Sequence, residues 1–361
     1  MSIYETGFII YTNSLRNKAF QHLSMSSSRS NLREVAHKAG VSPATVSRVL
    51  NRPDLVAEST RARVLAAAAE LDFEPSPSAR ALSRGRSYVM GALIPHIGYS
   101  VFADYIDAVQ IACHAAGYSL VMGAYHFDMD EELRQARRLV HSGVDALILV
   151  GFKHRPELFE LLDANDVKYV CTDVFDPKSP HPCIGYDNRG AGRRIAAHFI
   201  AAGHKRFAMV TGDTRRNDRM ALRLEGFRAE LRKHGFPLPA DAVFQGDYTI
   251  AEGSRGFSAV YAASQPTAVM CGNDVLAVGA LLEARKHGLS IPDDVEITGF
   301  DNLEWAAAFT PPLTTMHVPC TEMGRGAAEL LLARMEGRDA PHAVALPLAL
   351  VERETTRPAV T

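Results

Sequence analysis

Residues 32–51, LREVAHKAGVSPATVSRVLN, decide how the rest of the chain is interpreted. Apolar side chains recur in the first part at three- and four-residue spacing, as on one face of a helix: Leu32, Val35, Ala36 and Ala39. Gly40 follows where the chain must turn sharply, because glycine takes the left-handed conformation without penalty. Ser42 can cap a second helix that begins at Pro43, since proline fits the first helical position. The stretch therefore predicts a helix-turn-helix, with residues 43–51 as the helix that would enter a DNA major groove.

Further motifs extend this pattern along almost the whole chain. After the helix-turn-helix come ARALSRGRS, GYDN, AAGH, RLEGF, GNDVLAVGAL, GFDN and FTPPLTTMH, and the whole set spans roughly residues 31–351. With these motifs the sequence closely resembles the lactose-repressor (LacI/GalR) family. The resemblance implies a DNA-binding head, a hinge, and a two-lobed core that binds a small effector.

Charge is distributed unevenly, although the net charge of the 361 residues is only −2. Residues 1–87 contain 12 Lys and Arg against 7 Asp and Glu, whereas the remaining residues contain 27 against 34. A basic N-terminal part on an acidic body fits a DNA reader joined to a sensor. The five cysteines stand far apart without metal-type spacing, so we expect free thiols in a reducing cytoplasm and no bound metal. An apolar run of roughly 18 residues is missing, so no membrane span is expected.

Residues 1–30 depart from the family pattern. They contain no signal-peptide core, and the segment SMSSSRS is polar enough to be disordered. We therefore expect a disordered or mis-assigned N-terminal tail, with the folded protein starting near Met25. The predicted DNA-binding domain follows at residues 31–73, and its third helix is expected over residues 56–72.

Residues 74–87, EPSPSARALSRGRS, have the composition of a linker. The resemblance implies that this hinge becomes a short helix only on operator DNA, with Leu82 wedged between base pairs in the minor groove. Arg80 and Arg84 can neutralise phosphates beside it. The alternative is a hinge that acts only as a tether.

From Tyr88 onward, buried strands alternate with helices of about 10–15 residues, which predicts parallel sheets covered on both faces. Two rounds of this alternation predict two lobes with a ligand cleft between them, and the layout resembles periplasmic sugar-binding proteins. The resemblance gives the first lobe as residues 88–187 plus 318–337, and the second as residues 188–317 plus 340–351. The predicted fold class is a small all-α helix-turn-helix head joined by a hinge to an α/β core of two parallel-sheet lobes. Residues 352–361 are expected to form a C-terminal tail without a leucine-rich heptad repeat, so a homodimer is expected.

Two sets of head residues are candidates for DNA contact. Those that match base-facing positions of the family are Pro43, Ala44 and Arg48. Arg48 can donate to guanine O6 and N7, whereas the other two offer only apolar contact. Candidate phosphate contacts are Ser42, Thr45, Ser47, Asn51, Thr60 and Arg61. Simple helix capping is the alternative role for the hydroxyl residues, and both roles are compatible.

Effector candidates lie where strands of a parallel sheet end, as ligand sites usually do. The resemblance implies that Phe102 and Tyr248 pack on the effector and that the polar residues Arg223, Asn273 and Asp301 bind it. Two further candidates are Asp173 at the rim and Arg219, which lies one helical turn before Arg223. The alternatives are core packing for the two aromatic residues, and an Arg223–Asp301 ion pair across the cleft. This mixture suits a sugar, and the arginines favour a sugar acid or sugar phosphate unless nearby aspartates neutralise them.

Enzyme motifs are missing from the sequence. It contains no dinucleotide-binding G-x-G-x-x-G after a strand, no phosphate-binding P-loop and no G-x-S-x-G nucleophile elbow. We therefore expect no catalytic residue and no cofactor. The expected function is a cytoplasmic, sequence-specific transcriptional regulator, a repressor by preference, that binds a pseudo-palindromic operator and responds to a small effector. The alternative is a cytoplasmic sugar-binding module without a DNA-regulatory role.

Overall fold

The computed structural model describes residues 31–73 and 86–358. The chain divides into two compact units, Met1–Ser87 and Tyr88–Thr361, and we refer to their described parts as the head and the core. The predicted tail over residues 1–30 and the hinge candidates Leu82, Arg80 and Arg84 lie outside the described residues. No helix in the described ranges is long and apolar enough to cross a membrane.

The head contains three α-helices, α2 (Leu32–Ala39), α3 (Pro43–Asn51) and α4 (Glu58–Glu70), with a short 3-10 helix, η1 (Pro53–Leu55), before the last. Asn31 caps α2, because its side-chain oxygen accepts a hydrogen bond from the Glu34 backbone amide. The Glu34 carboxylate in turn accepts a hydrogen bond from the Asn31 backbone amide. Gly40 ends α2 in the left-handed conformation, with φ of 64°. The helices share a small apolar core made of Val35, Ala36, Ala39, Val46, Val49, Val64, Ala67 and Ala68.

The core consists of two six-stranded sheets, one in each lobe. The first sheet has the order β11-β5-β4-β3-β1-β2. Its strands are β1 (Val89–Ile94), β2 (Ser119–Ala124), β3 (Ala146–Val150), β4 (Lys168–Thr172), β5 (Cys183–Gly185) and β11 (Ala343–Ala345). The second has the order β12-β10-β9-β8-β6-β7. Its strands are β6 (Phe207–Gly212), β7 (Val243–Gly246), β8 (Ala268–Cys271), β9 (Glu296–Asp301), β10 (Thr314–His317) and β12 (Ala349–Val351). All pairings are parallel except that of β10 with β12.

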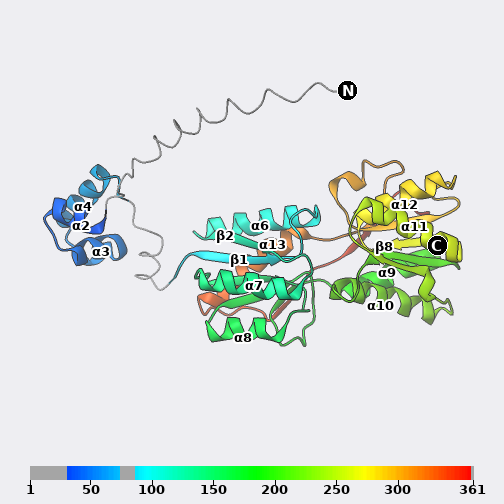
Figure 1. Cartoon of the computed structure of the whole chain (residues 1–361), viewed down its shortest axis with the longest axis horizontal. Coiled ribbons are helices and arrows are strands. Elements are labelled where there is room, and N and C mark those ends of the chain that lie inside the picture. Colours follow the sequence, from blue (N-terminus) through cyan, green and yellow to red (C-terminus); the bar gives the residue numbers. More distant parts are fainter. Residues whose placement is uncertain (1–30, 74–85, 359–361) are drawn as a thin grey trace, which may run out of the picture. The chain divides into compact units, whose positions relative to one another are not determined.

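Helices cover both faces of each sheet (Figure 1). Around the first sheet lie α6 (Val101–Ala115), α7 (Met129–His141), α8 (Pro156–Ala164) and α13 (Cys320–Met335). Around the second lie α9 (Asn188–Ala201), α10 (Asp218–Lys233), α11 (Ile250–Ser264) and α12 (Asp274–Lys286), with two 3-10 helices, η2 (Ala240–Ala242) and η3 (Glu304–Ala306). Both sheets are thus buried on two sides, which explains the continuous apolar strands in the sequence.

The C-terminal part of the chain differs from the prediction in two ways. Residues 340–351 were expected in the second lobe, but β11 pairs with β5 in the first sheet and only β12 joins the second. The chain therefore crosses between lobes after β11, not before it. Residues 352–361 were expected to be a tail, yet Thr355 and Thr356 are buried against β10, and the Arg357 guanidinium donates to the Glu296 carboxylate at 2.8 Å.

Candidate functional site

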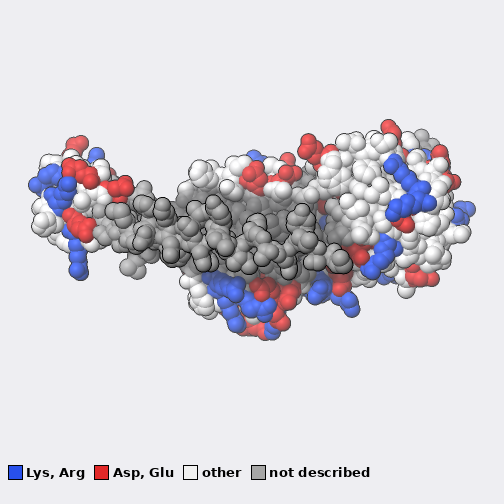
Figure 2. All heavy atoms as spheres, turned by 45° about the horizontal axis from the view of Figure 1, so that its top comes forward, with Lys and Arg blue, Asp and Glu red and all other residues white. Residues whose placement is uncertain are grey.

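Helix α3 presents its predicted base-facing residues to solvent. Pro43, Ala44 and Arg48 are exposed, and the Arg48 guanidinium makes no hydrogen bond or ion pair with another described residue. Val46 and Val49 face inward and fix the helix to the head core. The outer face of α3 is therefore free to contact a partner. Basic and acidic side chains both lie on the visible surface of the head (Figure 2).

The candidate phosphate contacts are partly engaged within the head. The Ser42 hydroxyl accepts from the Thr45 amide at 3.1 Å, and the Asn51 side-chain amide donates to the Ser47 carbonyl at 2.9 Å. The capping role considered for Ser42 is therefore present. Thr60 and Arg61 lie half-buried in the first turn of α4.

The core contains a cavity between its two lobes, which we call the inner cavity. Its empty volume is about 570 Å³, including space open to solvent. All seven effector candidates line it: Phe102, Asp173, Arg219, Arg223, Tyr248, Asn273 and Asp301. Sequence reasoning did not identify several other lining residues, among them Tyr99, Tyr105, Phe127 and Asn217.

Side chains that line the inner cavity lie near the ends of strands and in the first turns of helices. Asp173 directly follows β4, and Asp301 is the last residue of β9. Both have positive φ, 66° and 115°, a backbone conformation that is rare outside glycine and concentrates at functional sites. Arg219 and Arg223 lie in the first two turns of α10, one turn apart.

The Arg223 guanidinium is buried among neutral groups. It donates to the Asn188 side-chain oxygen, the Gly272 carbonyl and the Tyr186 hydroxyl, each at 2.9 Å. It also lies 3.4 Å from the centre of the Phe300 ring. No carboxylate among the described residues forms an ion pair with it, so the alternative of an Arg223–Asp301 ion pair is absent. No acidic side chain of the described residues therefore contacts the Arg223 guanidinium directly, although the charge of Arg223 acts on Asp301 from a greater distance.

Asp301 is 8% exposed and faces the same cavity. Burial raises the pKa of its carboxyl group well above the ordinary value, and the nearby Asp274 raises it further, while Arg223 opposes the change. Burial also raises the pKa of Asp274 to about 7, against hydrogen bonds from Thr315 and the Leu303 amide. The cavity therefore combines the donors of the Arg223 guanidinium with a carboxyl group whose pKa is raised.

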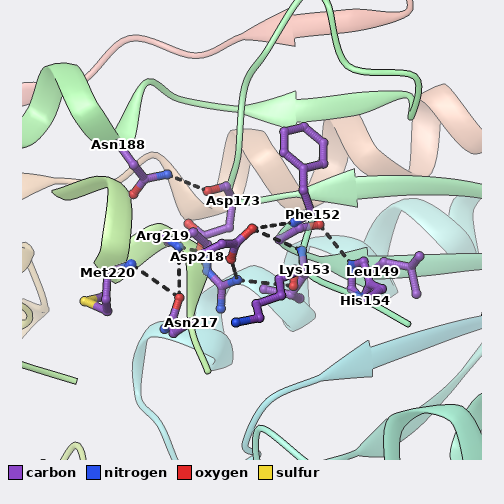
Figure 3. A network of polar contacts seen from close by, with 12 residues as sticks. Leu149, Phe152, Lys153, His154, Asp173, Asn188, Asn217, Asp218, Arg219 and Met220 are labelled. Atoms are coloured by element: carbon purple, nitrogen blue, oxygen red, sulfur yellow. Dashed lines mark hydrogen bonds and ion pairs between the residues drawn. The ribbon is translucent and has the colours of Figure 1, made fainter. Parts of the chain in front are cut away.

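Arg219 is engaged in an interlobe network (Figure 3). Its Nε lies 2.9 Å from the Asp173 carboxylate of the first lobe, and its Nη1 lies 2.7 Å from the neighbouring Asp218. Asp218 in turn accepts from the Phe152 and Lys153 amides of the first lobe at 2.6 and 3.2 Å. The internal neutralisation left open by the sequence therefore occurs at Arg219.

Gly151 makes this network sterically possible. It follows β3 with φ of 92°, and a Cβ there would overlap the Arg219 guanidinium and the Asp218 carboxylate. The loop that follows is held by His154, whose Nδ1 lies 3.0 Å from the buried Glu132 carboxylate and whose Nε2 lies 3.0 Å from the Gly151 carbonyl. Neither Gly151 nor this loop carries a sequence motif, so only the three-dimensional contacts show that they support the interlobe network.

A helix-turn-helix head and a core of two parallel-sheet lobes around a cavity lined by aromatic and polar side chains define a ligand-responsive DNA-binding regulator. Comparison with known proteins agrees. Residues 31–76 match the model for bacterial regulatory proteins of the lacI family, and residues 196–356 match a periplasmic binding protein-like domain. The chain belongs to the LacI family, as the sequence motifs predicted.

Curated relatives include the HTH-type transcriptional repressor PurR of Pectobacterium carotovorum subsp. carotovorum (strain PC1), which is 34% identical over 90% of this chain and 96% of its own. The PurR repressor of Aliivibrio salmonicida (strain LFI1238) is 33% identical over 85% of this chain and 92% of its own. These relatives are transcriptional repressors. This chain is likewise a transcriptional regulator with a DNA-binding head and an effector-binding core.

Solved structures of the family have the same architecture. The lac repressor dimer bound to operator and the anti-inducer ONPF is 26% identical with a TM-score of 0.80, covering 91% of this chain and 99% of that one. The CelR–cellobiose complex is 28% identical with a TM-score of 0.68, covering 91% of this chain and 100% of that one.

Proposed function

We propose that this chain is a cytoplasmic repressor that binds a pseudo-palindromic operator as a homodimer. A sugar-class effector that enters the inner cavity would either lower or raise the affinity for that operator. The observation that supports this proposal most is that all seven effector candidates line one interlobe cavity. Its polar groups suit hydroxyls, and the rings of Phe102 and Tyr248 suit the C–H face of a sugar.

On the DNA side, Arg48 would donate to a guanine edge while Pro43 and Ala44 contact a thymine methyl or a similar apolar surface. The phosphate contacts would come from Ser42, Thr45, Ser47, Asn51, Thr60 and Arg61. Leu82, with Arg80 and Arg84, would act in the minor groove. The exposed outer face of α3 supports this arrangement.

On the effector side, a sugar acid or sugar phosphate would place its anionic group at Arg223. A buried guanidinium with only neutral partners favours an anion or several hydroxyl oxygens. Arg219 already faces the carboxylates of Asp173 and Asp218. We propose that it orients Asp173 and joins the lobes, with a minor part in anion capture.

Homodimer formation is supported by exposed apolar side chains in both lobes of the core. They are Ile111, Val121, Met122, Ile250 and Leu282, with exposed fractions between 38% and 63%. Val121 and Met122 lie on β2, an edge strand of the first sheet. Apolar side chains at a sheet edge favour pairing with another chain.

Fluorescence anisotropy with DNA from upstream of the protein's own gene tests this function. Binding should be at least about a thousandfold tighter than to random DNA at the same salt concentration, and one sugar of a panel should change it. Sugar binding without any preference for the upstream DNA would instead support the alternative, a sugar-binding module without a regulatory role.

A further inference from the structure

The cleft continues outward from the inner cavity into a second, larger space, which we call the outer cavity. Its empty volume is about 1600 Å³, including space open to solvent. Tyr99, Phe127, Asn217 and Tyr248 line both cavities and form the wall between them. The outer cavity lies among loops that follow the carboxyl ends of β1, β2, β6 and β7. It therefore occupies the edge at which parallel sheets bind ligands, and the effector site described above does not use it.

Aromatic rings lead from the outer cavity to this wall. The His96 ring stacks on Tyr99 with centroids 4.4 Å apart and planes 13° apart, and the His126 ring meets the edge of His96 at 4.8 Å. Tyr99 lies 5.2 Å from Tyr248, which lies 5.7 Å from Phe127. His96 and Tyr99 are only half-buried and both line the outer cavity, so part of the stack is accessible to a ligand. The C–H face of a sugar ring packs well on such a surface.

The backbone beside this stack is strained. His126 and Phe127 are consecutive non-glycine residues with φ of 50° and 57°. The His126 amide donates to the Pro95 carbonyl at 2.8 Å, which holds the loop against the end of β1. Such conformations cost energy and persist at sites where a side chain must point in a defined direction. Here the strain turns two rings toward the cleft.

Charges in the outer cavity are balanced. Arg215 pairs with Asp213 at 3.1 Å, and Arg255 pairs with Glu252. Arg216 makes no side-chain ion pair with another described residue. Burial raises the pKa of Tyr99, and the nearby Asp247 carboxylate raises it further. Because three guanidinium groups and three carboxylates line this cavity, its net charge favours neither a strongly anionic nor a strongly cationic ligand. Planar donors and acceptors of both kinds suit a neutral group with many hydroxyls.

We propose that the outer cavity is a second glycosyl-binding subsite and that the effector is a disaccharide or a longer saccharide. One sugar ring would occupy the inner cavity, and the next would pack on the His96–Tyr99 stack with its hydroxyls toward Arg216. The inference rests on the proposed function, in which a sugar-class effector binds the inner cavity.

Titration calorimetry on the full chain tests the subsite with matched saccharides: glucose with maltose and cellobiose, galactose with lactose and melibiose, and mannose with mannobiose. In at least one set the disaccharide should bind about tenfold or more tightly than its monosaccharide. His96→Ala should remove this gain and leave the monosaccharide affinity within about twofold, because only the outer ring loses its surface. His96→Phe keeps a flat ring and should retain most of the gain.

His114→Ala on the exposed face of α6 is the matched control and should change neither affinity. A monosaccharide that binds as tightly as its disaccharides would overturn the subsite and leave the sugar-class effector intact. An equal loss of both affinities in His96→Ala would overturn it as well, because His96 would then act only on the inner cavity. If none of these saccharides binds but a single-ring sugar acid or sugar phosphate does, the subsite is wrong and the sugar class stands. If neither kind binds, both the sugar class and the subsite are wrong.

Discussion

Asp301 and Asp274 show how burial changes the chemistry of single residues at the carboxyl end of the second sheet. The pKa of each carboxyl group is raised from its ordinary value of 3.8, to about 7 for Asp274. Folding therefore favours the protonated form of each carboxyl group more than the unfolded chain does. For Asp274, the stabilisation that comes from protonation in the folded state is complete below pH 3.8. It is lost as the pH rises through about 7.

Asp301→Asn should remove this pH dependence at one of the two positions. The amide resembles the protonated carboxyl group and carries no charge to bury, so the variant should melt higher than the original chain at pH 8. The difference should shrink toward pH 4, and calorimetric melting at several pH values measures it. Asp293→Asn at an exposed position is the control. A difference that stays constant with pH would show that Asp301 is ionised in the folded core.

Arg48 is the residue on which sequence preference should depend most. Arg48→Ala should cost about 1–3 kcal/mol of operator binding and relax the base preference at one position in each half-site. Anisotropy titrations on operator and random DNA measure both effects. Arg325→Ala, on the exposed face of α13, is the control. Equal weakening on both DNAs would mean that Arg48 contacts only phosphate.

Among the elements, the short-range signals predicted the head well. Gly40 ends α2 in the left-handed conformation and Ser42 caps α3, as their positions in the sequence indicated. Such signals act within three or four residues, so the sequence alone reveals them. The alternation of strands and helices predicted the two-sheet core for the same reason, because each element carries its own apolar pattern.

Contacts between distant segments were not predictable in this way. Nothing within residues 340–351 distinguishes β11, which pairs with β5 of the first sheet, from β12, which pairs with the second. The convergence of the seven cavity residues followed from the rule for strand ends and from the family motifs. The interlobe network did not, because the partners of Asp218 are the backbone amides of Phe152 and Lys153, whose side chains carry no signal.

The loop after β3 gives a prediction for this network. Gly151→Ala should push the Arg219 guanidinium away from Asp173 and Asp218, because the added Cβ overlaps it. We expect a wider cleft, seen as a larger radius of gyration in X-ray scattering, and weaker effector binding. Gly117→Ala is a matched control, because Gly117 also has positive φ, 78°, but a Cβ there meets no atom within 4 Å. Identical behaviour of the two variants would assign the effect to backbone strain alone.

At the scale of the whole molecule, the head binds DNA and the core binds the effector, and the proposed homodimer would couple the two. In the proposed complex each head binds one half-site, so a monomer would contact only half of a pseudo-palindrome. The exposed apolar residues of both lobes provide a surface that a second copy would cover. Effector binding between the lobes can then change the separation of the two heads, provided that the core is dimeric.

Met122→Glu on β2 should therefore separate the chains and weaken operator binding without unfolding the core. Met122 is 41% exposed on an edge strand, so a carboxylate there is tolerated in the monomer but is costly once buried in a dimer interface. Sedimentation velocity should show a monomer, and operator affinity should fall about a hundredfold or more, toward that of a single half-site. Effector affinity and melting of the separated core should change little, because the inner cavity lies within one chain. Ile97→Glu is the matched control, since Ile97 is 64% exposed on a loop of the same lobe. If Met122→Glu sediments as the original chain does and binds operator equally well, the interface lies elsewhere and the edge of the first sheet faces solvent.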